Sequence, residues 1–117
     1  MNTNLSALNE IAGFIGTCLV DSDTGLMLSS EGGGKLDLEA ASALNTQVVR
    51  AKLTAISTLK LNDTIEDILI TLGKQYHLIR PLAANPSVFI YVAIDRKVAN
   101  LGLARLKLKE VEGSLSL

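Results

Sequence analysis

Residues 36–60, LDLEAASALNTQVVRAKLTAISTLK, form the longest periodic segment of the sequence and decide the fold. At about 100° per residue, the apolar side chains of this segment predict one long helix. They fall into two stripes along that helix, offset by roughly 110°. A helix with one apolar stripe needs one covering surface, so a helix with two stripes needs a surface on each side.

The two stripes lead us to expect a second copy of the chain. One stripe consists of Ala41, Leu44, Val48, Ala51, Ala55 and Leu59, and the other of Leu38, Val49, Leu53 and Ile56. Asn45 and Lys52 lie in the seam, where they either fix the register of a helix pair or are merely solvated. The polar face holds Glu39, Thr46, Arg50, Thr54 and Ser57. A chain of 117 residues has few elements to cover both stripes, so its own duplicate is the natural partner for one of them.

Strand-like segments flank the long helix on both sides. A short amphipathic helix at residues 5–12 comes first, then a strand, a turn of sequence DSDTG and a second strand, at residues 14–20, 21–25 and 26–30. Three further strands follow the long helix, at residues 64–71, 75–82 and 87–94. Their short connections predict antiparallel neighbours, because a parallel pair needs a long crossover.

The order of these elements predicts one α+β domain over residues 1–117. Residues 87–94 are apolar at nearly every position, which is typical of a central strand covered on both faces. Residues 64–71 carry Glu66 and are the candidate for an edge. A final helix is expected after Asp95 as its N-cap, with a stripe at Val98, Leu101, Ala104, Leu108 and Val111. The expected fold is α-β-β-α-β-β-β-α, a five-stranded antiparallel sheet with helices on both faces.

Composition limits the possible functions. The chain is 48% apolar, has a formal net charge of −1 and contains four aromatic residues. It therefore lacks both the basic footprint and the stacking platform expected of a nucleic-acid-binding protein. One cysteine allows no internal disulfide, and no apolar run approaches the roughly 20 residues of a membrane span. Without a signal-peptide pattern at the N-terminus, we expect a cytoplasmic protein.

The glycine-rich stretch SSEGGGKLDLEAAS, residues 29–42, raises the question of phosphate binding. A Walker-type loop needs Ser or Thr after its lysine, but Leu36 follows Lys35, and the earlier glycine position is occupied by Ser29. The dinucleotide-binding pattern fails as well, because its third glycine falls on Asp37. We interpret the glycines as residues that tolerate positive φ where the chain leaves a strand and enters a helix. The DSDTG segment lacks the ligands of a calcium loop and is interpreted as a hairpin turn.

The remaining candidates for chemistry do not assemble by spacing. Cys18 and His77 formally allow a nucleophile pair, but Cys18 lies in a strand where it is expected to be buried. Glu66 and Asp67 are adjacent and would point to opposite faces of a strand. Arg50 is a possible contact for a partner protein. We predict no catalytic residue, metal site or cofactor, and keep an enzyme or small-ligand binder only as the least favoured alternative.

Three segments together resemble the roadblock/dynein light chain family, and in particular its bacterial type. They are GTCLVDSDTGLML at residues 16–28, IEDILITLGKQYHLIRPL at residues 65–82 and VFIYVAIDRKVANLGLARLKLKEVE at residues 88–112. The resemblance implies a homodimer in which long helices lie side by side and third strands pair into one sheet. On this basis the expected dimer interface consists of Leu38, Asn45, Val49, Lys52, Leu53, Ile56, Ile65, Ile68 and Ile70.

The same resemblance implies a function without catalysis. Bacterial and archaeal members of the family are often associated with small Ras-like GTPases, and some stimulate GTP hydrolysis. The resemblance therefore implies a homodimeric regulator or scaffold that binds such a GTPase. The alternative is a structural adaptor of a motor, secretion or signalling complex that binds its partner irrespective of nucleotide.

Overall fold

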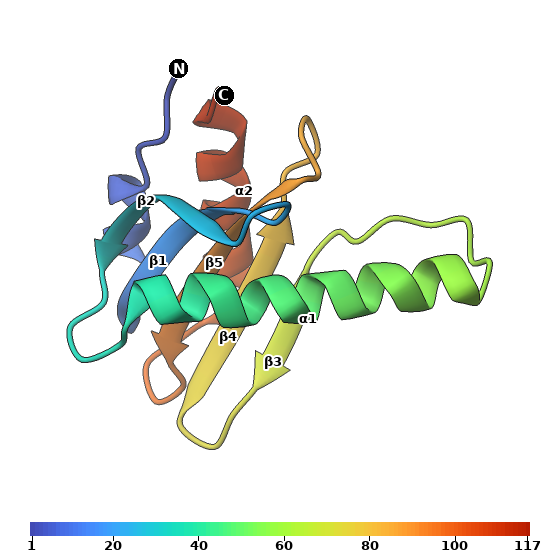
Figure 1. Ribbon diagram of the computed structural model, residues 1–117. Helices are drawn as coiled ribbons and strands as arrows, with labels where there is room; N and C mark the ends of the chain where they lie inside the picture. Colours follow the sequence, from blue (N-terminus) through green and yellow to red (C-terminus); the bar gives the residue numbers. More distant parts are fainter.

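A computed structural model describes the whole chain, residues 1–117, as one five-stranded antiparallel sheet between two helical layers (Figure 1). The strand order is β2-β1-β5-β4-β3, so β3 lies at one edge, as predicted, and β2 at the other. The elements are a 3-10 helix η1 (Ser6–Glu10), β1 (Phe14–Asp21), β2 (Leu26–Gly32), α1 (Leu38–Thr58), β3 (Ile68–Thr71), β4 (Gln75–Pro81), β5 (Val88–Asp95) and α2 (Leu101–Ser114).

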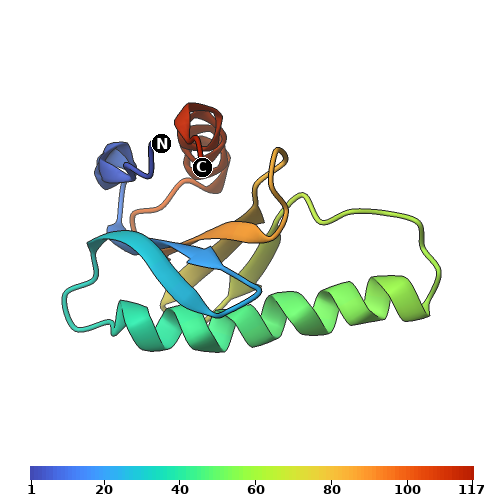
Figure 2. The same cartoon turned by 45° about the horizontal axis from the view of Figure 1, so that its top comes forward.

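The helices cover both faces of the sheet, which confirms the expected α+β architecture. Figure 2 shows α1 on one face and η1 with α2 on the other. Each face has its own apolar core, and the larger core lies beneath η1 and α2. β5 is the middle strand and is buried from Val88 to Ile94, as its uninterrupted apolar sequence predicted. None of the helices combines the length and the apolar character that crossing a membrane requires.

Glycines make the entry into α1 possible, which confirms their interpretation as loop residues. Gly32, Gly33 and Gly34 all have positive φ, a conformation that costs glycine little. Gly33 also passes so close to β1 that a Cβ atom at Gly16 would lie 2.8 Å from its backbone. Asp37 then begins the helix, because its Oδ1 accepts a hydrogen bond of 3.0 Å from the Ala40 backbone nitrogen.

Some element boundaries differ from the sequence-based expectation. The first helix is a single 3-10 segment of five residues. β3 begins only at Ile68, so Glu66 lies in the connection before it rather than in the strand. Asp95 ends β5, and the N-cap of α2 is Asn100, whose side chain accepts from the Leu103 backbone nitrogen. Val98 therefore precedes the helix and is exposed, instead of extending its buried stripe.

The largest correction concerns which stripe of α1 faces the sheet. Leu38 and Val49, expected at a dimer interface, are buried in the core of their own chain. Because Leu38 and Val49 were expected at the dimer interface, the other stripe was expected to face the sheet. Apart from the buried Ala41, it faces away instead, and its Leu44 and Leu59 are 60% and 65% exposed. Thr46, which was assigned to the polar face, is buried against the sheet.

Hydroxyl groups explain this exchange of the two stripes. Ser42 and Thr46 interrupt the apolar pattern of the sheet-facing side. In the sequence, that side therefore looks less apolar than the side that faces away. Each hydroxyl donates to the carbonyl four residues earlier, at 2.8 Å, to Leu38 and Ser42 respectively. A buried hydroxyl that is hydrogen-bonded in this way has little desolvation cost left, so the small polar side chains fit where α1 crosses the sheet closely.

Candidate functional site

The β3 edge is the first element of the candidate site, because it is an unprotected strand edge. Proteins blunt such edges with bulges, charges or covering segments. The other edge strand, β2, has a bulge where its register with β1 shifts, and Ser29 Oγ in this strand donates a 2.7 Å hydrogen bond to the Thr3 carbonyl. β3 is the uncharged sequence ILIT and pairs with β4 without a register shift. β3 is thus the edge that is ready to accept another strand.

Two residues of β3 direct their backbone groups outward. The Leu72 nitrogen donates to the Gln75 carbonyl at 2.8 Å, and residue pairs in an antiparallel ladder alternate between hydrogen-bonded and non-hydrogen-bonded. Ile70 and Ile68 therefore exchange hydrogen bonds with β4. The hydrogen bond from the Leu82 nitrogen to the Val88 oxygen shows which residues of β4 bond to β5. The alternate residues of β4 bond to β3, and they are the partners of Ile68 and Ile70. The N–H and C=O groups of Leu69 and Thr71 consequently point away from the sheet.

The second element of the site is the C-terminal half of α1, which projects past this edge. Figures 1 and 2 show the helix crossing the strands and continuing beyond β3, with the chain returning along a separate path. Val49 is the last buried residue of the helix, and Leu53 is already 46% exposed. Leu53 and Ile56 continue the sheet-facing side, but the sheet beneath them ends. The apolar side chains of the projecting half thus face a groove bounded by residues of the connection before β3, not the sheet itself.

The residues expected at a dimer interface fall into three groups. Leu38 and Val49 belong to the core and are corrections, as described above. Asn45 is half-buried and donates to the Ala41 carbonyl, while Lys52 is exposed on the projecting half of α1. The third group consists of the half-buried Ile65, Ile68 and Ile70 at the edge, together with the exposed Leu53 and the half-buried Ile56 on the projecting half of α1. Those at the edge and on the projecting half lie beside one another and remain predictions for a dimer interface.

Arg50 is held by its own chain. Its Nε and Nη2 atoms donate to the carbonyls of Ser22 and Asp23 at 3.0 and 2.7 Å. These bonds fix the guanidinium against the turn between β1 and β2. A role for Arg50 in contacting a partner stays a prediction, but its first effect is to position that turn against α1.

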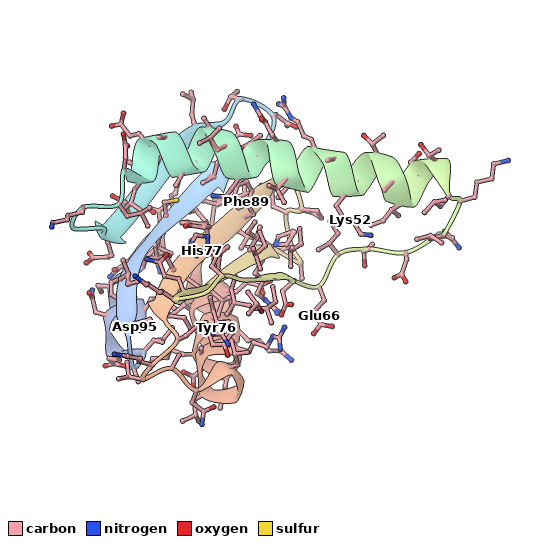
Figure 3. All side chains as sticks on the ribbon, turned by 90° about the horizontal axis from the view of Figure 1, so that it is seen from below. Lys52, Glu66, Tyr76, His77, Phe89 and Asp95 are labelled. Atoms are coloured by element: carbon pink, nitrogen blue, oxygen red, sulfur yellow. The ribbon has the colours of Figure 1, made fainter.

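A groove separates α1 from the connection that returns to β3, residues 59–67. One part of the groove is a cavity of about 430 Å³ lined by Val49, Leu53, Ile65 and the buried Arg80, among others. In Figure 3, Lys52 extends from α1 toward the connection, whereas Glu66 lies on the connection and points away from the helix. Asp67 fixes the end of the connection, because it accepts hydrogen bonds of 3.1 and 3.2 Å from Arg105 of α2.

The candidate nucleophile pair is not assembled. Cys18 is buried with its Sγ in hydrogen-bond contact with Ser42 Oγ at 3.3 Å, whereas His77 bonds to Gln75 and Tyr91. Burial raises the pKa of the Cys18 thiol, and the Ser42 hydrogen bond offsets this only in part. No group of three or more His, Cys, Asp or Glu side chains is placed to hold a metal ion.

His77 makes the stability of the fold depend on pH. It lies half-buried beneath α1 (Figure 3), with its ring edge-on to that of Tyr91 at 5.2 Å between centroids. Burial lowers the pKa of His77 below its ordinary value of 6.5, and it raises the pKa of Tyr91 to about 12, with a smaller contribution from Cys18. Between pH 6.5 and the lower pKa of folded His77, the unfolded chain therefore binds a proton at this side chain that the folded chain does not bind.

We expect the free energy of unfolding to fall as the pH decreases from about 6.5 through the lower pKa of folded His77. Urea unfolding at pH 7.5, 6.5 and 5.5 measures this loss. The variant His77→Gln, which keeps a hydrogen-bonding side chain, should show a flatter dependence over the same interval. An unchanged slope in His77→Gln would assign the pH dependence to other groups.

Comparison with known proteins identifies the fold. No family model matches the sequence, and no curated protein matches it. Solved structures do match. A Roadblock/LC7 domain from Streptomyces avermitilis aligns with a TM-score of 0.79 at 14% identity over 93% of this chain and 88% of that one. MglB from Myxococcus xanthus aligns with a TM-score of 0.77 at 20% identity, covering 96% and 93%.

A third structure, the gliding protein MglB from Thermus thermophilus, has a TM-score of 0.73 at 16% identity and covers 92% of this chain and 78% of its own. These similarities are structural, since all three identities are low. The chain thus has the roadblock fold that the sequence resemblance implied.

Proposed function

We propose that the chain is a homodimeric regulator or scaffold that binds a small Ras-like GTPase and has no catalytic activity of its own. One observation carries the proposal: the flat apolar edge of β3 lies beneath the side of α1 that projects past it. Either feature alone would be a liability, because an exposed edge aggregates and an uncovered apolar helix face is unstable in water.

A second copy related by a two-fold axis perpendicular to the sheet at β3 would cover both the strand edge and the apolar side of α1. This arrangement would pair β3 with its duplicate in antiparallel fashion and extend the sheet to ten strands. Both α1 helices would lie on the same face, and each projecting half would lie over the sheet of the other copy. Leu53 and Ile56 would then contact the second copy, together with the edge residues Ile65, Ile68 and Ile70. A closed interface of this kind is the usual solution for a self-complementary surface.

The GTPase is proposed from the resemblance and from the surface that remains. Leu44 and Leu59 on the outward stripe of α1 are largely exposed in the single chain. They would stay exposed in such a dimer, because this stripe faces away from the sheet. Exposed apolar patches with a polar rim are typical of protein-binding sites. The family resemblance supports a small GTPase as the occupant. The outward stripes of the two antiparallel α1 helices would form its docking surface.

The proposal predicts that Leu44→Asp weakens binding of the GTPase but keeps the dimer. The side chain is on the outward stripe, so the charge enters the docking surface and should weaken binding by at least about tenfold. The partner to test is a Ras-like GTPase encoded beside this protein, loaded with GTP or GDP and measured by co-purification, titration calorimetry and hydrolysis rate. Glu39→Lys, at the start of the same helix, is the control for a change of charge alone.

Three results would decide between the functions. Nucleotide-dependent binding that Leu44→Asp removes supports the proposal. Binding that is equal for the GTP and GDP forms would favour the structural adaptor. A chain that remains a monomer at high concentration and recovers no GTPase would overturn the proposed function.

A further inference from the structure

The direction of the backbone groups in β3 limits how two copies can pair, and the following inference rests on the proposed homodimer. Residues directly opposite each other in an antiparallel pair either both face the partner strand or both face away. Only Leu69 and Thr71 face outward within β3. Each of them must therefore lie opposite another outward-facing residue of the second copy.

Three symmetric registers with the axis within residues 69–71 meet this condition, and one of them pairs all the outward-facing residues of β3. With Leu69 on the two-fold axis, Thr71 lies opposite residue 67, and with Thr71 on the axis, Leu69 lies opposite residue 73. Both of these opposing residues are outside β3, and Asp67 is turned toward Arg105. With Ile70 on the axis, Leu69 lies opposite Thr71 in both directions. All four outward-facing residues of the two strands then pair with one another.

The Ile70-centred register brings complementary side chains together beyond the strand. Counting outward, Ile68 lies opposite Leu72, which is 42% exposed in the single chain. Asp67 lies opposite Gly73, where an added Cβ would have no atom within 4 Å, so the second copy has room to approach. Glu66 lies opposite Lys74. On each side of the axis the inferred contacts are thus, in order, an apolar pair, an open space at the glycine and a pair of opposite charges.

The charges around these positions favour the same arrangement. The connection before β3 carries Asp63, Glu66 and Asp67, and Asp67 is neutralised by Arg105. Lys52 extends into the groove behind Glu66 but forms no ion pair with it. Arg96 and Lys97 lie near the turn that holds Lys74. The neighbouring Asp95 side chain accepts a hydrogen bond from the backbone nitrogen of Lys97. An acidic connection and a basic turn therefore lie at opposite ends of the same edge.

We infer that residues 66–74 form a self-complementary segment in which Ile70 lies on the two-fold axis and Lys74 of each copy pairs with Glu66 of the other. The hydrogen bonds of Leu69 and Thr71 hold the two strands together. The Glu66–Lys74 pairs select the register, since a shift to either of the other two registers separates them. The second copy thus supplies Lys74 as the counter-charge for Glu66 in the acidic connection.

Cysteine cross-linking tests the register. Ile70→Cys places two thiols opposite each other on the axis, at a separation that a disulfide bridges. Ile68→Cys is the matched control on the same face of the same strand. In the inferred register its Cα atom is about 14 Å from that of its duplicate, beyond the roughly 7 Å limit of a disulfide. We expect mild oxidation to cross-link Ile70→Cys and to leave Ile68→Cys uncross-linked.

Charge reversal tests the pairing of side chains. Glu66→Lys and Lys74→Glu each create two like-charge contacts in their own dimer and should weaken self-association on the order of tenfold by sedimentation equilibrium. Mixing the two variants should produce a heterodimer of nearly native affinity, because both of its contacts then join opposite charges. Simple damage to either variant would not be repaired by mixing.

The outcomes separate this inference from the proposed function. Cross-linking at residue 70 alone, together with rescue on mixing, supports the inference. A native dimer in which Ile70→Cys fails to cross-link, or in which mixing brings no rescue, overturns the register while the proposed homodimer stands. A native chain that does not dimerise overturns both.

Discussion

Replacing Glu112 with Gln is expected to lower the free energy of unfolding by about 3–5 kcal/mol, which is the usual cost of breaking a buried ion pair on one side. Glu112 lies in the last turn of α2 and pairs with Arg80 of β4, and each side chain is only 11% exposed. Its second oxygen accepts a 2.7 Å hydrogen bond from the Ala83 nitrogen. The neutral amide would leave the buried guanidinium of Arg80 without its counter-charge. Urea unfolding at fixed protein concentration measures the loss.

The control for this change is Glu110→Gln on the same helix. The Glu110 side chain is 62% exposed, and its nearest cation is Lys107 at 3.6 Å, so we expect almost no effect. The double variant Arg80→Met/Glu112→Leu removes both charges and should recover much of the lost stability. If Glu112→Gln were no more destabilising than Glu110→Gln, the ion pair would not be what fixes α2 to β4.

The ion pair is also expected to make the free energy of unfolding depend on pH, in a range separate from that of His77. Burial alone would raise the pKa of Glu112, but the hydrogen bonds from Ala83 and Arg80 and the positive charges of Arg80 and Lys109 outweigh it and lower the pKa. The stabilisation is thus complete above the ordinary value of about 4.5 and is lost as the pH falls through the lower folded value. Loss that sets in as the pH falls below 6.5 belongs to His77, and loss that sets in below 4.5 belongs to Glu112.

Local patterns in the sequence were enough to predict the sheet. The uninterrupted apolar run of β5 identified the central strand, and the short connections around β4 fixed the antiparallel order. These features depend on neighbouring residues, so they are visible in the sequence. The place of β3 at an edge followed from the same reasoning, although the strand proved shorter than expected, beginning only after Asp67, whose side chain bonds to Arg105 of α2.

The candidate site was only partly predictable, because it depends on contacts between distant residues. Arg80 and Glu112 are 32 positions apart, and nothing in the spacing of either residue indicates the pair. The orientation of α1 depends on Ser42 and Thr46 satisfying their hydroxyls within the helix, which apolar periodicity does not register. The second stripe was found correctly, but the choice of which stripe faces the sheet required the packed structure.

Because the two stripes have different neighbours, one substitution on each should separate self-association from partner binding. Leu53→Asp is expected to weaken the homodimer by about a hundredfold or more. Leu53 lies on the sheet-facing side of α1 just beyond the edge of its own sheet, where the proposed second copy would cover it. An aspartate there would be buried without a partner in both halves of the dimer. Light scattering and sedimentation equilibrium measure the change.

Leu44→Asp is the matched control, since it makes the same exchange on the same helix at a comparable exposure, 60% against 46% for Leu53. Both changes should therefore affect the stability of a single chain similarly, by an amount that urea unfolding at low concentration reports. Only Leu53→Asp should produce monomers, because Leu44 points away from the sheet and from the second copy. If Leu44→Asp alone dissociated, the chains would associate through the outward stripe. If both variants stayed dimeric, neither stripe would form the interface, and the edge of β3 would need another cover.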